Sequence, residues 1–141
     1  MIPQGTLSYL VVMAEPRHRQ ILGRRGEEEA STFLCSQNYV VVAKNYRSPY
    51  GEIDLIVRDQ NNRNALVFVE VRTHADPRFG DPLESVNVRK QRQVAKTALY
   101  YLTRNGLENS EARFDVIGIR WEDGQAHISH VKGAFELSGS R

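Results

Sequence analysis

Residues 51–72 read GEIDLIVRDQNNRNALVFVEVR, and this stretch decides the fold. Residues 52–58 and 65–72 are predicted to be β-strands, with Ile53, Leu55 and Val57 on one face of the first and Val67, Val69 and Val71 on one face of the second. The polar run between them, residues 59–64, is typical of a hairpin loop. The stretch therefore predicts two strands that lie next to each other in a sheet.

Two carboxylates stand near the middle of these strands among hydrophobic neighbours. Alternation places Ile53 with Leu55 and Val57 on one face and Asp54 on the other, and Glu70 stands between two valines. A carboxylate in such surroundings is costly unless it is paired or bound to a cation. On neighbouring strands the two acids can lie close together, and a cation between them would remove their repulsion. Oxygen ligands of this kind favour Mg²⁺ or Mn²⁺.

The chain on either side of this hairpin alternates helices with strands. The predicted elements are a helix over 24–37, strands over 39–45, 52–58 and 65–72, a helix over 85–104, and strands over 113–121 and 126–131. A loop rich in Gly, Pro and Asp is expected over residues 73–82, and Asn105-Gly106 is expected to end the second helix. The order αβββαββ indicates an α/β fold with one mixed central sheet flanked by helices.

A third acid is expected from the first helix, where Glu27, Glu28 and Glu29 are adjacent. At 100° per residue, Glu27 lies about 70° from the hydrophobic stripe of the helix, Glu29 about 90° and Glu28 about 170°. Glu27 is therefore the candidate that reaches over the sheet, and the other two are expected to face water.

Arg72 follows Glu70 by two residues, so both side chains point to the same side of one strand. A cation beside an acid that holds a metal suits phosphodiester cleavage, because it stabilises the charge that builds on the phosphate. The alternative is structural: Glu70 and Arg72 would form an ion pair on a solvated face, and Asp54 would satisfy a backbone turn.

The second helix carries a local basic surface on a nearly balanced protein. The net charge is only +2, from 19 basic and 17 acidic residues, but residues 85–107 contain no acid. Basic side chains of this helix are expected to contact nucleic-acid phosphates, the alternative being an ordinary solvated face; they are Arg89, Lys90, Arg92 and Lys96. Lys90 lies at the flank of the stripe, from where it could reach a phosphate or the carboxylates. Leu99 is expected on the hydrophobic side.

Several classes of protein are excluded or disfavoured. The single cysteine, Cys35, rules out an internal disulfide and a cysteine-rich zinc cluster, and the sequence contains no glycine-rich phosphate loop that would bind a nucleotide cofactor. The longest strongly apolar run has four residues, so no membrane span is expected, and a cytoplasmic location is the prediction. Arg113 and Asp115 share a strand face, where structural pairing is expected rather than catalysis. We expect an irregular extension over residues 1–22, a domain over 23–135 and a tail over 136–141.

The combined motifs resemble the bacterial YraN family of predicted endonucleases, which are similar to archaeal Holliday junction resolvases. The matching segments are Gly26-Glu27-x-x-Ala30-x-x-Phe33-Leu34, Asn45-Tyr46-Arg47, Gly51-Glu52-Ile53-Asp54-Leu55-Ile56, Phe68-Val69-Glu70-Val71-Arg72-Thr73, Lys90 and Arg113-Phe114-Asp115-Val116-Ile117. The resemblance implies a restriction-endonuclease-like fold. It also implies an active site of the Asp…Glu-x-Lys type, which falls on Asp54, Glu70 and Arg72, with Glu27 as an added acid. Arg72 departs from this pattern, because related nucleases usually have lysine there.

The function expected from these observations is metal-dependent endonuclease activity on structured or branched DNA. Glu27, Asp54 and Glu70 would hold Mg²⁺ or Mn²⁺, the backbone carbonyl of Val71 would complete the shell, and Arg72 would steady the phosphate. Because resolvases cut paired strands as dimers, the resemblance also implies a homodimer. One alternative is a module of the same fold that binds DNA without cutting it. Another is a carboxylate-pair hydrolase acting on a glycan, which the basic helix and the single tryptophan disfavour.

Overall fold

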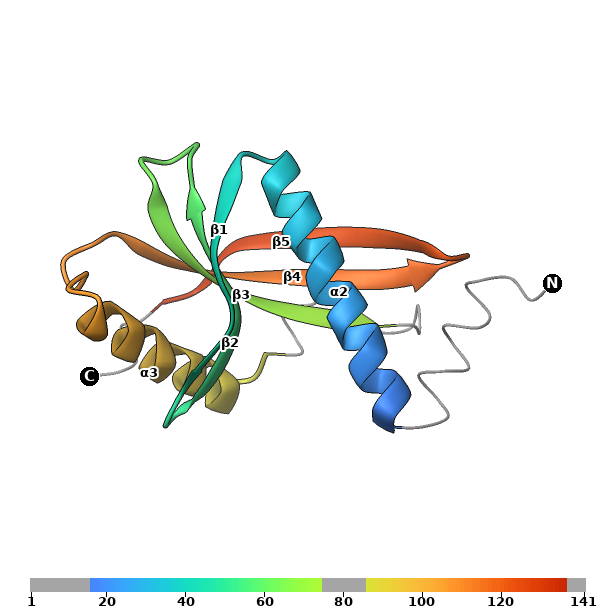
Figure 1. The fold of residues 1–141 in the computed structure, drawn as a ribbon, viewed down its shortest axis with the longest axis horizontal. Coiled ribbons are helices and arrows are strands. Elements are labelled where there is room, and N and C mark those ends of the chain that lie inside the picture. Colours follow the sequence, from blue (N-terminus) through green and yellow to red (C-terminus); the bar gives the residue numbers. More distant parts are fainter. Residues whose placement is uncertain (1–15, 75–85, 137–141) are drawn as a thin grey trace.

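One five-stranded sheet organises the chain. The computed structural model describes residues 16–74 and 86–136. Its elements are α2 (Pro16–Ser36), β1 (Tyr39–Ser48), β2 (Gly51–Asp59), β3 (Ala65–His74), α3 (Val88–Arg104), β4 (Ala112–Glu122) and β5 (Gln125–Phe135). The strands lie in the order β1-β2-β3-β4-β5. Only the β3–β4 pair is parallel, since α3 connects these two strands, and the other pairs are antiparallel (Figure 1).

The predicted order αβββαββ on a mixed sheet flanked by helices is confirmed, and it is consistent with the restriction-endonuclease-like fold. The first helix begins earlier than predicted, at Pro16, so helical structure enters the expected irregular extension over residues 1–22. Residues 1–15 of that extension lie outside the described residues, as do residues 75–82 of the expected loop, whose first two residues belong to β3. The proposed division into extension, domain and tail stays a prediction.

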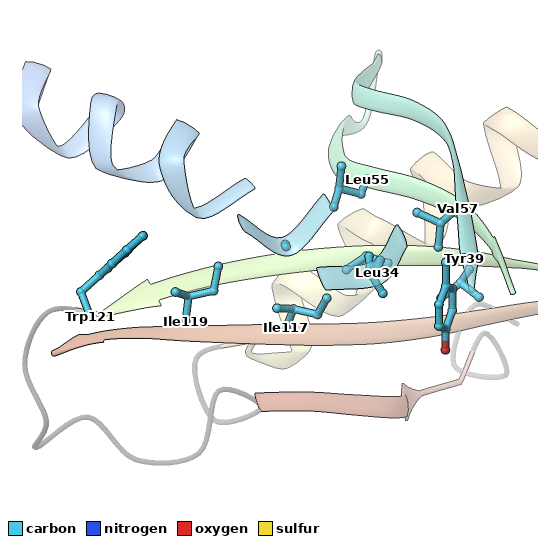
Figure 2. Packing of buried hydrophobic residues seen from close by; sticks show 10 residues of the cluster. Leu34, Tyr39, Leu55, Val57, Ile117, Ile119 and Trp121 are labelled. Carbon is cyan, nitrogen blue, oxygen red and sulfur yellow. The ribbon is translucent and has the colours of Figure 1, made fainter. Parts of the chain in front are cut away.

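The two faces of the sheet carry separate hydrophobic clusters, one under each helix. Ala30 and Leu34 of α2 are fully buried against one face, as the helical spacing predicted. Figure 2 shows this cluster, in which Leu34 lies over side chains from β2 and β4. On the opposite face, α3 packs Val94 and Ala98 against a cluster that includes Phe68 and Phe114. Burial of these apolar surfaces is the main stabilisation of the fold.

Two hydrophobic residues lie where the sequence analysis did not place them. Ile53 packs in the α3 cluster and not with Leu55 and Val57, because it lies beyond the last β2–β3 pair, Leu55 opposite Val69, where the hairpin bends toward α3. Leu99 is 51% exposed. At 100° per residue it lies about 140° from Val94, which is beyond the buried arc of α3.

Asp115 lies at the centre of a buried polar network, which confirms that Arg113 and Asp115 form a structural pair. Arg113 donates hydrogen bonds to both carboxylate oxygens of Asp115 (2.8 and 3.0 Å), and His130 Nε2 lies 2.7 Å from Oδ2. Arg113 also donates to Asp59 at 3.0 Å, which ties the β2–β3 hairpin to β4. Burial raises the pKa of Asp115, but hydrogen bonds from His130 and Arg113 outweigh it and hold the pKa below its usual range.

Candidate active site

The candidate site lies where β2 and β3 separate. The two strands pair from Asp59 opposite Ala65 to Leu55 opposite Val69, and the pairing ends there. Beyond this point the β1–β2 hairpin bends toward α3 while β3 continues beside β4 (Figure 1). Asp54 fills the opening, since its Oδ2 accepts a hydrogen bond from the backbone N–H of Val71 at 2.8 Å. The first carboxylate is therefore fixed between the strands.

Glu70 lies in the same opening and is almost completely buried, with 2% of its surface exposed. Its Oε2 is 3.7 Å from Lys90 Nζ of α3 and 3.9 Å from Arg72 Nη2 of its own strand. Within the described part of the chain, its Oε1 is buried without a hydrogen-bond partner. A buried acceptor without a partner is costly, so this oxygen is the natural position for a ligand.

Lys90 reaches Glu70 because of the way α3 begins. Asn87 caps the helix, and its side chain accepts the backbone N–H of Lys90 at 2.9 Å. This cap fixes the first turn of α3 next to the opening between the strands. The sequence analysis left open whether Lys90 reaches a phosphate or the carboxylates, and the structure places it on the carboxylate.

Burial and mutual repulsion make both carboxylates hard to ionise. Burial, followed by the charge of Asp54, raises the pKa of Glu70 to about 8, although Lys90 and Arg72 act in the opposite direction. Burial also raises the pKa of Asp54, against the hydrogen bond from Val71 and the two cations. A bound cation would stabilise the ionised forms of both carboxylates, because it compensates their charges.

Glu27 of α2 lies near enough to Asp54 for the two charges to interact. The preceding residue, Gly26, packs so tightly that a Cβ there would collide with the Thr73 hydroxyl of β3. Burial, and next the charge of Asp54, raise the pKa of Glu27, while the Asn45 side chain partly offsets this rise. Of its two neighbours, Glu28 is exposed and Glu29 is half-buried.

The three predicted acids do not form one compact ligand group. Among the described residues, no three His, Cys, Asp or Glu side chains are placed to hold a metal ion together. Asp54 and Glu70 form the central pair, and Glu27 interacts with Asp54. A fourth acid that the sequence analysis did not assign to the site, Glu52, raises the pKa of both Asp54 and Glu27. Its position two residues before Asp54, on the same strand face, was the signal that could have found it.

A basic groove adjoins the carboxylates. It has a volume of about 850 Å³, and its lining includes all the predicted phosphate contacts and Arg72; the residues are Tyr50, Arg72, Asn87, Val88, Arg89, Lys90, Arg92, Gln93 and Lys96. Arg72 and Lys90 belong both to the groove and to the surroundings of Glu70. The groove therefore borders the carboxylate pair through these two cations. Tyr50 and Gln93 are lining residues that the sequence analysis did not name.

The fold and this site define an α/β protein with a carboxylate pair, buried Glu70 and half-buried Asp54, beside a basic groove. A sequence model of the family described as "Uncharacterised protein family UPF0102" matches residues 26–119. The chain belongs to this family, which confirms the resemblance to the YraN proteins.

Several members of the family are closely similar to this chain over most of their length. A UPF0102 protein of Pelobacter propionicus is 48% identical over 126 residues, which cover 89% of each chain. One of Geobacter sulfurreducens is 43% identical over 122 residues, covering 86% of this chain and 93% of the relative. One of Desulfosudis oleivorans is 38% identical over 120 residues, covering 85% of this chain and 94% of the relative.

No helix within the described residues has the length and apolar character needed to cross a membrane.

The raised pKa of Glu70 predicts how the stability of the metal-free protein depends on pH. Because the pKa is about 8 in the folded protein and ordinarily 4.5, the folded state binds more protons between these values. The free energy of unfolding should therefore fall as the pH rises from 5 to 8. In Glu70→Gln this contribution is absent, so the variant should be more stable than the wild type at pH 8 by about 1–3 kcal/mol, with a smaller difference at pH 5.

Chemical denaturation in the presence of a chelator at both pH values measures this difference. Glu28→Gln, which neutralises an exposed glutamate on α2, is the matched control. If the free energy of unfolding changes equally with pH in Glu70→Gln and in the wild type, the charge of Glu70 is already compensated in the folded protein.

Proposed function

We propose that this protein is a divalent-metal-dependent endonuclease that hydrolyses phosphodiester bonds in structured or branched DNA. The observation that carries the proposal is the carboxylate pair, half-buried Asp54 and buried Glu70, beside a groove lined by basic side chains. Carboxylates alone would repel a phosphate, and a basic groove alone would only bind it. Their combination suits hydrolysis of an anionic backbone.

The residues present fit a hard divalent cation. Glu70 Oε1 is buried without a partner among the described residues, and the donors are carboxylate oxygens, which suit Mg²⁺ or Mn²⁺. In the proposal Asp54 and Glu70 hold the ion, and Glu27 and the backbone carbonyl of Val71 complete its shell. When bound, such an ion supplies Lewis-acid polarisation of the phosphoryl oxygen and activation of water.

The side chains of the protein supply the remaining functions. Arg72 can donate two hydrogen bonds to a phosphate from its planar guanidinium. Lys90 carries a compact positive charge to the same place, 3.7 Å from Glu70. Both groups would stabilise the charge that builds on the phosphate during hydrolysis. The basic residues farther along the groove, Arg92 and Lys96, would hold the neighbouring phosphates.

Cleavage of a panel of DNA substrates tests the proposal. Duplex, flap and four-way junction DNA should be incubated with Mg²⁺, with Mn²⁺ and with a chelator. We expect cleavage of the branched substrates with either metal and none with the chelator. Gel filtration of the same protein, alone and with junction DNA, tests the homodimer that the resemblance to resolvases implies.

A second candidate function is a DNA-binding module that does not cut. Two observations favour it: Arg72 stands where related nucleases usually have lysine, and the described acids do not gather into a three-ligand group. This module would bind the same branched DNA through the basic groove. Binding without cleavage under every metal condition would select this function over the nuclease.

The salt dependence of binding tests the groove itself. Replacing Arg89, Arg92 and Lys96 with glutamine should weaken binding to all DNA sequences alike. If each side chain contacts one phosphate, the slope of log K against log salt should become shallower by about 0.9 per contact, or about 2.7 in total. Anisotropy titrations over a range of salt concentrations measure this slope.

The matched control removes the same charge elsewhere on the surface. Lys44, Arg63 and Lys132 are exposed and do not line the groove. Their triple replacement with glutamine should leave the slope close to that of the wild type. If both triple variants change the slope equally, binding depends on overall charge and the groove has no special role.

A further inference from the structure

A second, smaller hollow continues from the basic groove along α3. It has a volume of about 340 Å³ and is lined by Tyr50, Lys96, Leu99, Tyr100 and Thr103. Tyr50 and Lys96 line both the groove and this hollow, so the two lie next to each other. The hollow therefore begins where the proposed phosphate contacts end.

Three of the five lining side chains, Tyr50, Leu99 and Tyr100, are aromatic or apolar, and two of these are largely exposed. Tyr50 is 53% exposed and Leu99 is 51% exposed. The rings of Tyr50 and Tyr100 meet edge to face, with centroids 6.2 Å apart, and Arg104 lies over the Tyr100 ring at 5.3 Å. An exposed aromatic surface bordered by cations is the combination that binds unpaired nucleic-acid bases.

Tyr50 is held in place, although it sits at the tip of the β1–β2 hairpin. Its backbone N–H donates to the Ser48 hydroxyl at 3.0 Å, and this hydroxyl lies 3.1 Å from that of Thr97, which is fully buried in α3. Gly51, with a φ of 145°, lies so close to α3 that a Cβ would collide with the Gln93 side chain. The backbone of the hairpin tip is thus fastened to α3, so less backbone freedom is lost when a base stacks on the Tyr50 ring.

We propose that this hollow binds an unpaired nucleobase, stacked on Tyr50, of a DNA strand whose phosphates lie along Arg92 and Lys96. The inference rests on the proposed function in one respect, that the groove binds DNA. A paired base has its faces covered by its neighbours in the duplex, so it cannot enter the hollow. The substrate class is therefore DNA with a single-stranded end, such as a flap, an overhang or an opened branch.

Binding to two matched DNA molecules, in the presence of a chelator so that nothing is cut, tests the inference. One is a blunt duplex, and the other is the same duplex with a short overhang that carries a fluorescent base analogue quenched by stacking. The wild type should prefer the overhang by about 5- to 150-fold, the range expected for one stacked base. The analogue should be quenched on binding.

Tyr50→Ala should lose this preference, measured as the ratio of its affinities for the overhang and the blunt duplex, and it should lose the quenching. Tyr50→Phe should keep both, because it retains the ring. Val40→Ala, which shortens an exposed residue on β1 away from the groove, is the matched control and should behave as the wild type.

Two outcomes would overturn the inference: equal binding of both DNA molecules by the wild type, or an overhang preference that survives in Tyr50→Ala. Neither outcome depends on cleavage. A Tyr50-dependent preference in a protein that cuts no DNA would support this inference and contradict the nuclease proposal. Cleavage of DNA by a protein that lacks the overhang preference would support the nuclease proposal and contradict this inference.

Discussion

Replacing Glu70 with glutamine is expected to abolish metal-dependent cleavage, with a loss of about 10³-fold or more, since Lewis-acid stabilisation of the transition state is worth several kcal/mol. The variant keeps the shape of the side chain but loses the charge of the oxygen pair that Lys90 and Arg72 surround. Asp54→Asn should have a similar effect. It retains an oxygen that can accept the Val71 N–H, so the opening between the strands should keep its shape. Single-turnover cleavage of the best substrate in the panel measures both losses.

Circular dichroism and thermal unfolding show whether each variant is folded, and Glu28→Gln serves as the control with the same chemical change on an exposed part of α2. Cleavage by Glu70→Gln at the rate of the wild type would show that this carboxylate takes no part in the reaction. The same result for both Asp54→Asn and Glu70→Gln would contradict the proposed site as a whole, even if the protein proved to be a nuclease.

The sequence predicted the strands because hydrophobic and β-branched residues are concentrated in these segments and polar turn residues lie between them. The predicted strand over 65–72 lies within β3, Ala65–His74, with Phe68 and Val69 on opposite faces of the sheet as expected. The second helix ends at Arg104, with Asn105 as its C-cap and Gly106 at a φ of 66°, which is the conformation that glycine adopts easily. Local signals of this kind do not depend on the rest of the fold.

The sequence analysis was wrong where tertiary structure overrides the local pattern. Ile53 lies just beyond the last β2–β3 pair, where the hairpin bends toward α3, so its partners are set by that bend and not by alternation. Leu99 is hydrophobic at a position that α3 leaves exposed. Leu99 was assigned to the core because it is hydrophobic, although in the structure it lines the hollow beside Tyr50.

The candidate site was predictable in its composition but not in its arrangement. Asp54 and Glu70 were placed together from the hairpin alone, and the structure brings both into one opening. The contact between Lys90 and Glu70 joins residues twenty positions apart through the packing of α3 on the sheet. Strand periodicity carries no information about that packing. The pairing of Arg113 with Asp115 was predicted because both lie on one strand, whereas His130 joins them only through the register of β4 and β5.

Replacing Arg72 with alanine is expected to lower the cleavage rate by about 10²–10³-fold, the usual cost of losing one transition-state hydrogen-bond donor. Arg72 Nη2 lies 3.9 Å from Glu70, and within the described residues its Nε is buried without a partner, so the side chain is held at the carboxylates with a donor unused. A guanidinium keeps its charge and does not take a proton from water, so its role would be to donate to the phosphate. Arg72→Lys retains the positive charge at the same site and should keep or raise the rate.

Single-turnover cleavage of junction DNA by the wild type, Arg72→Lys and Arg72→Ala separates the two candidate functions. Equal rates for Arg72→Ala and the wild type would show that Arg72 is only a residue of the strand, and Lys90 would then be the cation that acts on the phosphate. If the wild type is inert with every metal and Arg72→Lys cuts, the natural protein is a DNA-binding module. The replacement of a lysine ammonium by a guanidinium at this one position would then account for the missing activity. The expected order is Arg72→Lys equal to or faster than the wild type, and both much faster than Arg72→Ala.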